Sequence, residues 1–217
     1  VSFYVKPNSY IDKEALNRGN STYFPDQVIP MLPELLSNNL CSLIPNEERP
    51  CLAVHLYLDT TGKLLKYFFS RTIIKSKARL TYKEIQNAYD GKSNNIDYKL
   101  LEEVIVPLYL VYNLLRDQRT KRGALEIEIA EKKININNKN GNIKVNNIIK
   151  YESHKLIEEL MILANIAAAK ELNSKKKYSI YRVHQKPDIE KIKSFDKIFE
   201  KYNLPLSKKK IYVRKVC

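Results

Sequence analysis

Apolar residues repeated at helical spacing predict two long helices. From Asp97 to about Arg122, leucine, valine and isoleucine recur three and four positions apart, so that they fall on one face of a helix. Pro107 lies inside this segment and should kink or split it, because proline has no N–H to donate to the preceding turn. A second helix is predicted from Ser153 to Leu172, where small alanines on the apolar face permit close packing. Shorter helices are predicted at three further segments, 12–18, 81–89 and 188–202.

Strand-like runs predict two hairpins. Cys51–Asp59 and Lys63–Ile74 are rich in apolar, β-branched and aromatic residues, and the short turn at 60–62 joins them. Ala124–Ala130 alternates as a strand, and Asn140-Gly141, a dipeptide that strongly favours a two-residue hairpin turn, lies further along. Three other segments are predicted to be extended: strands at 1–6 and 178–183, and a proline-punctuated stretch at 23–33.

These elements together predict a mixed α/β (α+β) fold, in which hairpins of a mixed sheet pack with helices. The 217 residues, 44% of them hydrophobic, are enough to bury a core. Because no repeat or low-complexity linker divides the chain, one unit is expected from residue 1 to 206, followed by a basic tail at 207–217. The chain begins inside a strand-like pattern, and we therefore expect further sequence upstream of Val1.

Positive charge is compatible with a polyanionic partner. The chain has 38 lysines and arginines against 24 acidic residues, giving a net charge of +14. Cations that neutralise phosphates release condensed counterions, which favours nucleic-acid binding. The sequence is also rich in Lys, Asn, Ile and Tyr together, a mixture that an AT-rich genome produces regardless of function. Charge alone therefore leaves nucleic-acid binding and its absence equally open.

Several other functional classes lack their usual signals. No run of eighteen apolar residues or secretory signal is present, so no membrane partner and a cytoplasmic location are predicted. The three cysteines have no C-x-x-C spacing, which argues against a disulfide framework or a zinc site. Glycine-rich phosphate loops and nucleophile-elbow motifs are missing, and the acidic residues form no Asp-rich cluster for two metal ions. No catalytic or metal-binding residue is therefore predicted.

Six segments resemble, in the same order, the catalytic (RNB) domain of the ribonuclease II and ribonuclease R family. They are VSFYVKP at 1–7, LNRGNSTYFPDQVIPMLPELLSNNLCSL at 16–43, SKARLTYKEI at 76–85, RGALEIEI at 122–129, HKLIEELMILANIAAAKEL at 154–172 and YRVHQKPD at 181–188. The resemblance covers roughly residues 1 to 205 and is nearer to the ribonuclease R branch. Matches this short mean little singly, whereas their order makes the resemblance specific.

The resemblance implies a part of a processive 3′-to-5′ exoribonuclease, which uses magnesium to release nucleoside monophosphates from single-stranded RNA. In the family, an Asp cluster precedes the segment that VSFYVKP resembles, and an arginine-rich motif follows YRVHQKPD. Neither motif matches residues of this sequence. Mg²⁺ is thus implied as a cofactor, while its ligands are absent from this chain.

Four residues match positions with which the family holds RNA. Tyr23 matches the aromatic residue that stacks on the 3′-terminal base, and Tyr82 matches a tyrosine that grips RNA further along the channel. Glu158 matches a carboxylate that contacts the terminal nucleotide. Ile127 stands where well-known members have an aromatic clamp residue, and an aliphatic side chain offers no π face to a base. Taken alone, each tyrosine is more often a half-buried packing residue.

Three hypotheses follow. The chain is a piece of an exoribonuclease, inactive alone and active only with the flanking segments or a complementing chain that carries them. Alternatively, it is a non-catalytic remnant that still binds RNA. As a third possibility, it is the product of a split, decaying gene. An unrelated basic protein remains as an alternative, against which the ordered matches argue.

Overall fold

The structure is a computed structural model that describes residues 1–92, 95–124, 131–136, 143–183, 185 and 188–202. It divides into two compact units, Val1–Glu171 and Leu172–Cys217, each of which is described by itself. The described elements combine helices with two-stranded antiparallel sheets, which confirms the predicted mixed fold. The domain boundary predicted at residue 206 lies outside the described residues and stays a prediction.

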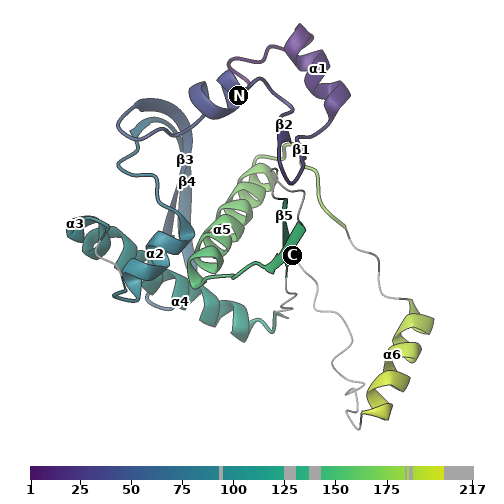
Figure 1. Cartoon of the computed structure of the whole chain (residues 1–217). Coiled ribbons are helices and arrows are strands. Elements are labelled where there is room, and N and C mark those ends of the chain that lie inside the picture. The colour runs from purple at the N-terminus through teal and green to yellow at the C-terminus, as the bar shows by residue number, and fades with distance from the viewer. Residues whose placement is uncertain (93–94, 125–130, 137–142, 184, 186–187, 203–217) are drawn as a thin grey trace. The chain divides into compact units, whose positions relative to one another are not determined.

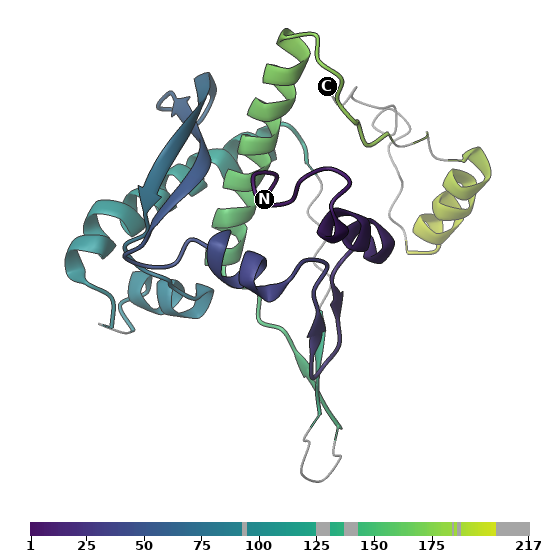
Figure 2. The ribbon, with the colours of Figure 1, turned by 90° about the horizontal axis from the view of Figure 1, so that it is seen from above.

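Strands β3 (Glu48–Leu58) and β4 (Leu64–Lys75) form the predicted long hairpin, visible as a two-stranded ribbon in Figures 1 and 2. Asp59 organises its turn, because one carboxylate oxygen accepts hydrogen bonds from the backbone N–H and the hydroxyl of Thr61 and from the backbone N–H of Lys63. Gly62 has φ +84°, the left-handed conformation that a side chain disfavours. The turn residues thus fix the hairpin register.

The principal core of the first unit lies among three helices, α2 (Tyr82–Tyr89), α4 (Val106–Lys121) and α5 (Glu152–Ser174). Its buried members are Ile105, Tyr109, Tyr112 and Leu156. Both tyrosines place a phenol inside the protein, where an unbonded hydroxyl would be unfavourable. The Tyr109 hydroxyl donates to Oε1 of Gln86, and that of Tyr112 donates to the Glu152 carboxylate.

The predicted interruption near Pro107 is confirmed as a change of helix type. Helix α3 (Tyr98–Leu100) continues into a π-helical turn, η2 (Leu101–Ile105), and then into α4. Pro107 follows directly, near the start of α4. In an α-helix its ring would clash with the carbonyl four residues earlier. A wider turn before the proline is the usual way in which a helix accommodates such a disturbance.

The N-terminal part contains α1 (Tyr10–Arg18), the two-residue strands β1 (Thr22–Tyr23) and β2 (Val28–Ile29), and a second π-helix, η1 (Leu35–Leu40). Gly19 ends α1 as predicted. The predicted strand at 1–6 is wrong: this segment forms turns in which the N–H groups of Tyr4 and Val5 both donate to the Val1 carbonyl. Local hydrogen bonds there replace those that a partner strand would supply.

The second predicted hairpin is present as β5 (Lys132–Ile136) and β6 (Ile143–Asn147), paired from Lys132↔Asn147 to Ile136↔Ile143. Its Asn140-Gly141 turn, and nearly all of the strand predicted at 124–130, lie outside the described residues.

The second unit contains α6 (Ile189–Lys201), whose N-cap Asp188 accepts from the Glu190 N–H, as the predicted helix requires. The strand predicted at 178–183 is wrong, because the segment has no regular structure. Tyr178 and Ile180 are fully exposed. Alternation of residue types gives a strand only where a neighbouring strand and an apolar surface receive it.

Candidate nucleic-acid interface

Tyr82 is the first residue of α2, and a capping box fixes its backbone. The Thr81 hydroxyl accepts from the Glu84 N–H, and the Glu84 carboxylate accepts from the Thr81 N–H at 2.7 Å. The hydrogen bonds from Thr81 hold the pKa of Glu84 below its usual value, so the carboxylate is charged at neutral pH. The polar residues around Tyr82 therefore set where α2 begins.

The start of α5 holds Tyr82 from the other side. Ser153 is buried, and its hydroxyl donates to the Tyr82 carbonyl at 2.8 Å. The imidazole of His154 stacks on the phenol ring of Tyr82, with 4.0 Å between ring centroids and 22° between ring planes. Tyr82 is nonetheless 42% exposed as a residue. An aromatic ring that is packed on one side and open to solvent elsewhere is suited to stacking on a base.

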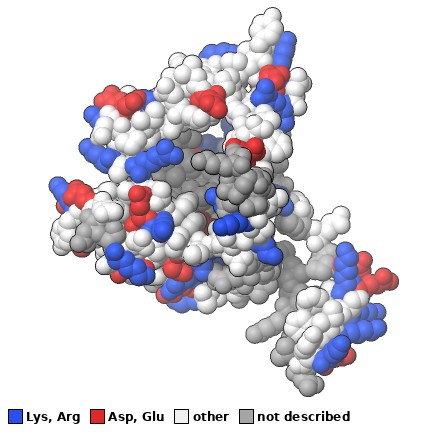
Figure 3. Space-filling view, in the orientation of Figure 1, with Lys and Arg blue, Asp and Glu red and all other residues white. Residues whose placement is uncertain are grey.

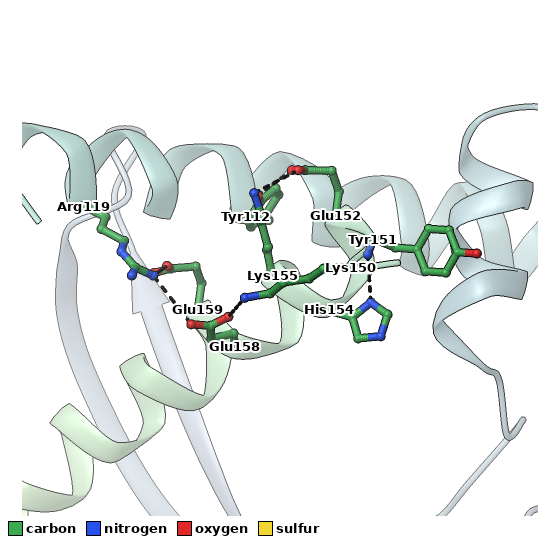
Figure 4. Close-up of polar contacts among 9 residues, drawn as sticks. All are labelled: Tyr112, Arg119, Lys150, Tyr151, Glu152, His154, Lys155, Glu158 and Glu159. Carbon is green, nitrogen blue, oxygen red and sulfur yellow. Dashed lines mark hydrogen bonds and ion pairs between the residues drawn. The ribbon is translucent and has the colours of Figure 1, made fainter. Parts of the chain in front are cut away.

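Glu158 lies one helical turn after His154, on the same face of α5. Its carboxylate is 3.2 Å from the ammonium of Lys150 and 3.9 Å from the guanidinium of Arg119 (Figure 4). Arg119 also forms an ion pair with Glu159, which is buried. Lys150 offsets the charge of Glu158, and Arg119, which Glu158 shares with Glu159, adds to this effect. These cations weaken the repulsion that a lone carboxylate would exert on a phosphodiester.

Behind these groups, two tyrosines of α4 join the helices. Tyr112 donates to Glu152 of α5 at 2.6 Å, and Tyr109 stacks on Tyr89 of α2 at 3.7 Å. Burial raises the pKa of each phenol to about 12, and the neighbouring carboxylates act in the same direction. Both are therefore neutral donors at neutral pH, so that α4 is joined to the C-terminal half of α2 and to the N-terminal end of α5.

Tyr82 stacks on His154, which lies one helical turn before Glu158 on α5. Tyr23 lies on β1 and takes no part in this stacking. Tyr23 is 77% exposed as a residue. Its small hairpin is tied to α1, because Arg18 donates to the Pro30 carbonyl. Ile127 lies outside the described residues.

Sequence reasoning missed His154, Ser153 and Arg119 as supports of this surface. A signal for His154 was available in HKLIEEL, where histidine and the first glutamate are four residues apart and so share a helix face. No local pattern indicates that Ser153 binds the backbone of a helix seventy residues earlier, or that Arg119 reaches α5. Both contacts depend on tertiary packing.

A cavity of about 230 Å³ lies elsewhere in the first unit, where the β3–β4 turn meets α4 and α5. Its lining includes Gly62, Leu115, Glu159 and Leu163, but not Tyr23, Tyr82 or Glu158, the predicted RNA contacts that the structure describes. Among the described residues, no group of three or more His, Cys, Asp or Glu side chains is arranged to hold a metal ion. No helix in this described part is both long and apolar enough to span a membrane.

A sequence profile of the RNB domain matches residues 1–215. The chain belongs to the RNB family. Among curated members, it is 41% identical over 208 residues to ribonuclease R of Vibrio cholerae and 39% identical over 207 residues to that of Escherichia coli K12. Each alignment covers 95% of this chain, but only 25% and 26% of the respective relative. The chain thus spans about a quarter of the length of these RNB proteins.

Solved structures agree with the family assignment. Apo ribonuclease R of Mycoplasma genitalium matches with a TM-score of 0.90 and 30% identity, over 98% of this chain and 33% of that one. The same enzyme in complex with ribose-methylated single-stranded RNA matches with a TM-score of 0.86 and 32% identity, over 93% of this chain and 32% of that one. The described structure therefore corresponds to part of the ribonuclease R catalytic domain.

Proposed function

We propose that this chain is the RNA-holding part of a ribonuclease R-like 3′-to-5′ exoribonuclease. The observation that carries the proposal is the match to M. genitalium ribonuclease R over 98% of the chain. That enzyme has been solved with ribose-methylated single-stranded RNA and with double-stranded RNA. Single-stranded RNA is therefore the proposed partner, and the cytoplasm the proposed location.

In the proposed complex, the exposed ring of Tyr23 stacks on the 3′-terminal base, and Tyr82 stacks on a base further from the 3′ end. Glu158 contacts the terminal nucleotide as a hydrogen-bond acceptor for ribose hydroxyls, with Lys150 and Arg119 reducing its repulsion of phosphate. Ile127 packs against the terminal base opposite Tyr23. Stacking on an aromatic ring tolerates any base, which suits an enzyme that degrades RNA of varied sequence.

The hydrolytic chemistry is assigned by family membership. RNB enzymes of this type are expected to use magnesium, but the described residues offer no cluster of metal ligands. No described side chain of this chain is therefore assigned a role in the hydrolytic step. We further propose that these 217 residues alone bind RNA without releasing nucleoside monophosphates, and that turnover requires flanking segments or a complementing chain.

A second candidate function is RNA binding without catalysis in the native protein, as in a remnant or the product of a split gene. Two solved structures with low sequence identity give this alternative its basis. Candida glabrata Dss1, an exoribonuclease, has a TM-score of 0.75 at 18% identity, and yeast Ssd1, a pseudonuclease, has 0.70 at 14%. Because similar folds occur in a nuclease and in a pseudonuclease, the fold alone does not decide between the candidates.

One experiment tests both the proposed RNA binding and the proposed lack of turnover by the isolated chain. The purified chain is incubated in magnesium with a single-stranded RNA, and mononucleotide release is followed alongside gel-shift binding. We expect binding without release, weakened in Tyr23→Ala and unchanged in Tyr10→Ala, since Tyr10 is 93% exposed on α1 and has no assigned role. Mononucleotide release that EDTA abolishes would contradict the inactivity of the isolated chain. Absence of binding, or equal losses in both variants, would contradict the assigned RNA contact.

A further inference from the structure

Two consecutive residues at the start of α5 hold both the backbone and the ring of Tyr82. Ser153 donates its hydroxyl proton to the Tyr82 carbonyl, and its own N–H donates to Gln86, in the middle of α2. His154 then covers the phenol ring at 4.0 Å. The ring of Tyr82 is thus oriented by its neighbour on α5, although 42% of the residue surface is exposed.

His154 is itself oriented by two contacts. Its Nδ1 accepts the backbone N–H of Tyr151 at 3.1 Å, as Figure 4 shows, which requires this nitrogen to carry no proton. The Tyr151 ring lies nearly parallel to the imidazole, with 5.7 Å between centroids and 17° between planes. An imidazole that is fixed by a backbone hydrogen bond and a neighbouring ring presents a defined surface to Tyr82.

We propose that His154 is a positioning residue that holds the Tyr82 ring ready to stack on an RNA base. The inference rests on the proposed function, in which Tyr82 contacts RNA. A free tyrosine side chain must be ordered when a base binds, and this ordering weakens affinity. The contact with His154 supplies that order before RNA arrives. His154 also starts the helical face on which Glu158 follows one turn later, so that one element aligns two RNA contacts.

Two variants separate the ring of His154 from its hydrogen bond. His154→Phe keeps an aromatic ring but loses the acceptor for the Tyr151 N–H, whereas His154→Asn keeps an acceptor and loses the ring. Binding of a fluorescently labelled oligoadenylate to the 217-residue chain is measured by anisotropy without magnesium. We expect His154→Asn to weaken binding roughly threefold to tenfold, the range for loss of an aromatic pair. His154→Phe should stay within about twofold of wild type.

The opposite order, with Asn retaining and Phe losing affinity, would overturn the proposal. Affinity would then depend on the hydrogen bond from the Tyr151 N–H to residue 154 and not on an aromatic ring at this position. Circular dichroism checks that each variant is folded, and His154→Gln replaces the Asn variant should that one unfold. His55→Asn is the matched control, since His55 also stacks on an aromatic ring, that of Phe68 at 4.1 Å, but lies on β3. An equal loss in this control would also overturn the proposal.

A double-mutant cycle tests whether His154 acts through Tyr82. In the Tyr82→Leu background, His154→Asn should cause no further loss of affinity, because the ring that it positions is gone. Additive losses would overturn the inference and leave the proposed function standing. If Tyr82→Leu binds RNA as well as wild type does, the assignment of Tyr82 fails, and the positioning role fails with it.

Discussion

At the scale of single residues, the ion pair between Arg119 and Glu159 is the charged contact that most directly tests how α4 and α5 are joined. The Glu159 side chain is only 8% exposed, so removal of its partner leaves a buried charge uncompensated. We predict that Arg119→Met lowers the free energy of unfolding by about 3 kcal/mol, measured by urea denaturation. Lys92→Met breaks an exposed pair with Asp90 and should change it by less than about 1 kcal/mol. Similar values for both variants would contradict the prediction.

The buried phenol of Tyr112 predicts a pH dependence at alkaline pH. Its pKa is raised to about 12, so the folded state favours the neutral form. The resulting stabilisation is complete below the unfolded pKa of about 10 and is lost as the pH rises from about 10 to 12. Wild type should therefore lose stability relative to Tyr112→Phe over this window, in urea denaturation at several pH values. Lysine ionisation affects both proteins alike. A difference between their free energies of unfolding that stays constant through this window would contradict the prediction.

At the scale of elements, the hairpin turn and α4 meet at Gly62. A Cβ at this position would lie 2.9 Å from backbone atoms of Leu114, in addition to the strain of its positive φ. Gly19 has a similar φ of +70° but open space around it. We predict that Gly19→Ala lowers the free energy of unfolding by about 1 to 2 kcal/mol. Gly62→Ala should lower it by a further 1 to 3 kcal/mol, roughly the effect of overpacking. Equal losses of stability in the two variants would show that the close approach of Gly62 to Leu114 of α4 adds no cost of its own.

Elements whose signals are local were predicted from the sequence. Thr81 and Gly19 marked helix ends correctly because caps depend on a few neighbouring residues. The strand at 178–183 was wrong because a strand is stabilised by partners that alternation cannot reveal. The π-helical turn η2 was foreseen only as a disturbance at Pro107. Likewise, the resemblance indicates Tyr82 and Glu158, but the stacking of His154 on Tyr82 follows only from the packing of α2 against α5.

At the scale of the whole molecule, charged residues and aromatic rings are expected to contribute separately to RNA binding. Among the described residues on the face shown in Figure 3, Lys and Arg are interspersed with Asp and Glu and do not gather into one continuous basic patch. The proposed RNA contacts include two tyrosines and a carboxylate that already has cationic partners. Affinity for RNA should therefore combine a stacking contribution from a few rings with a diffuse electrostatic contribution.

These two contributions respond differently to salt, which allows them to be separated. Each neutralised phosphate of a single strand contributes a slope of about −0.7 to the plot of log affinity against log salt concentration. A ring neutralises no phosphate. We predict that oligoadenylate binding, measured by anisotropy from low to high NaCl, weakens with a slope that is the same in wild type and in Tyr82→Leu. The variant should be weaker at every salt concentration, by roughly fivefold or more if one stacked base is lost. A changed slope would mean that Tyr82→Leu alters how phosphates are held, whereas affinity independent of salt would mean that the excess of lysine reflects sequence composition and not RNA binding.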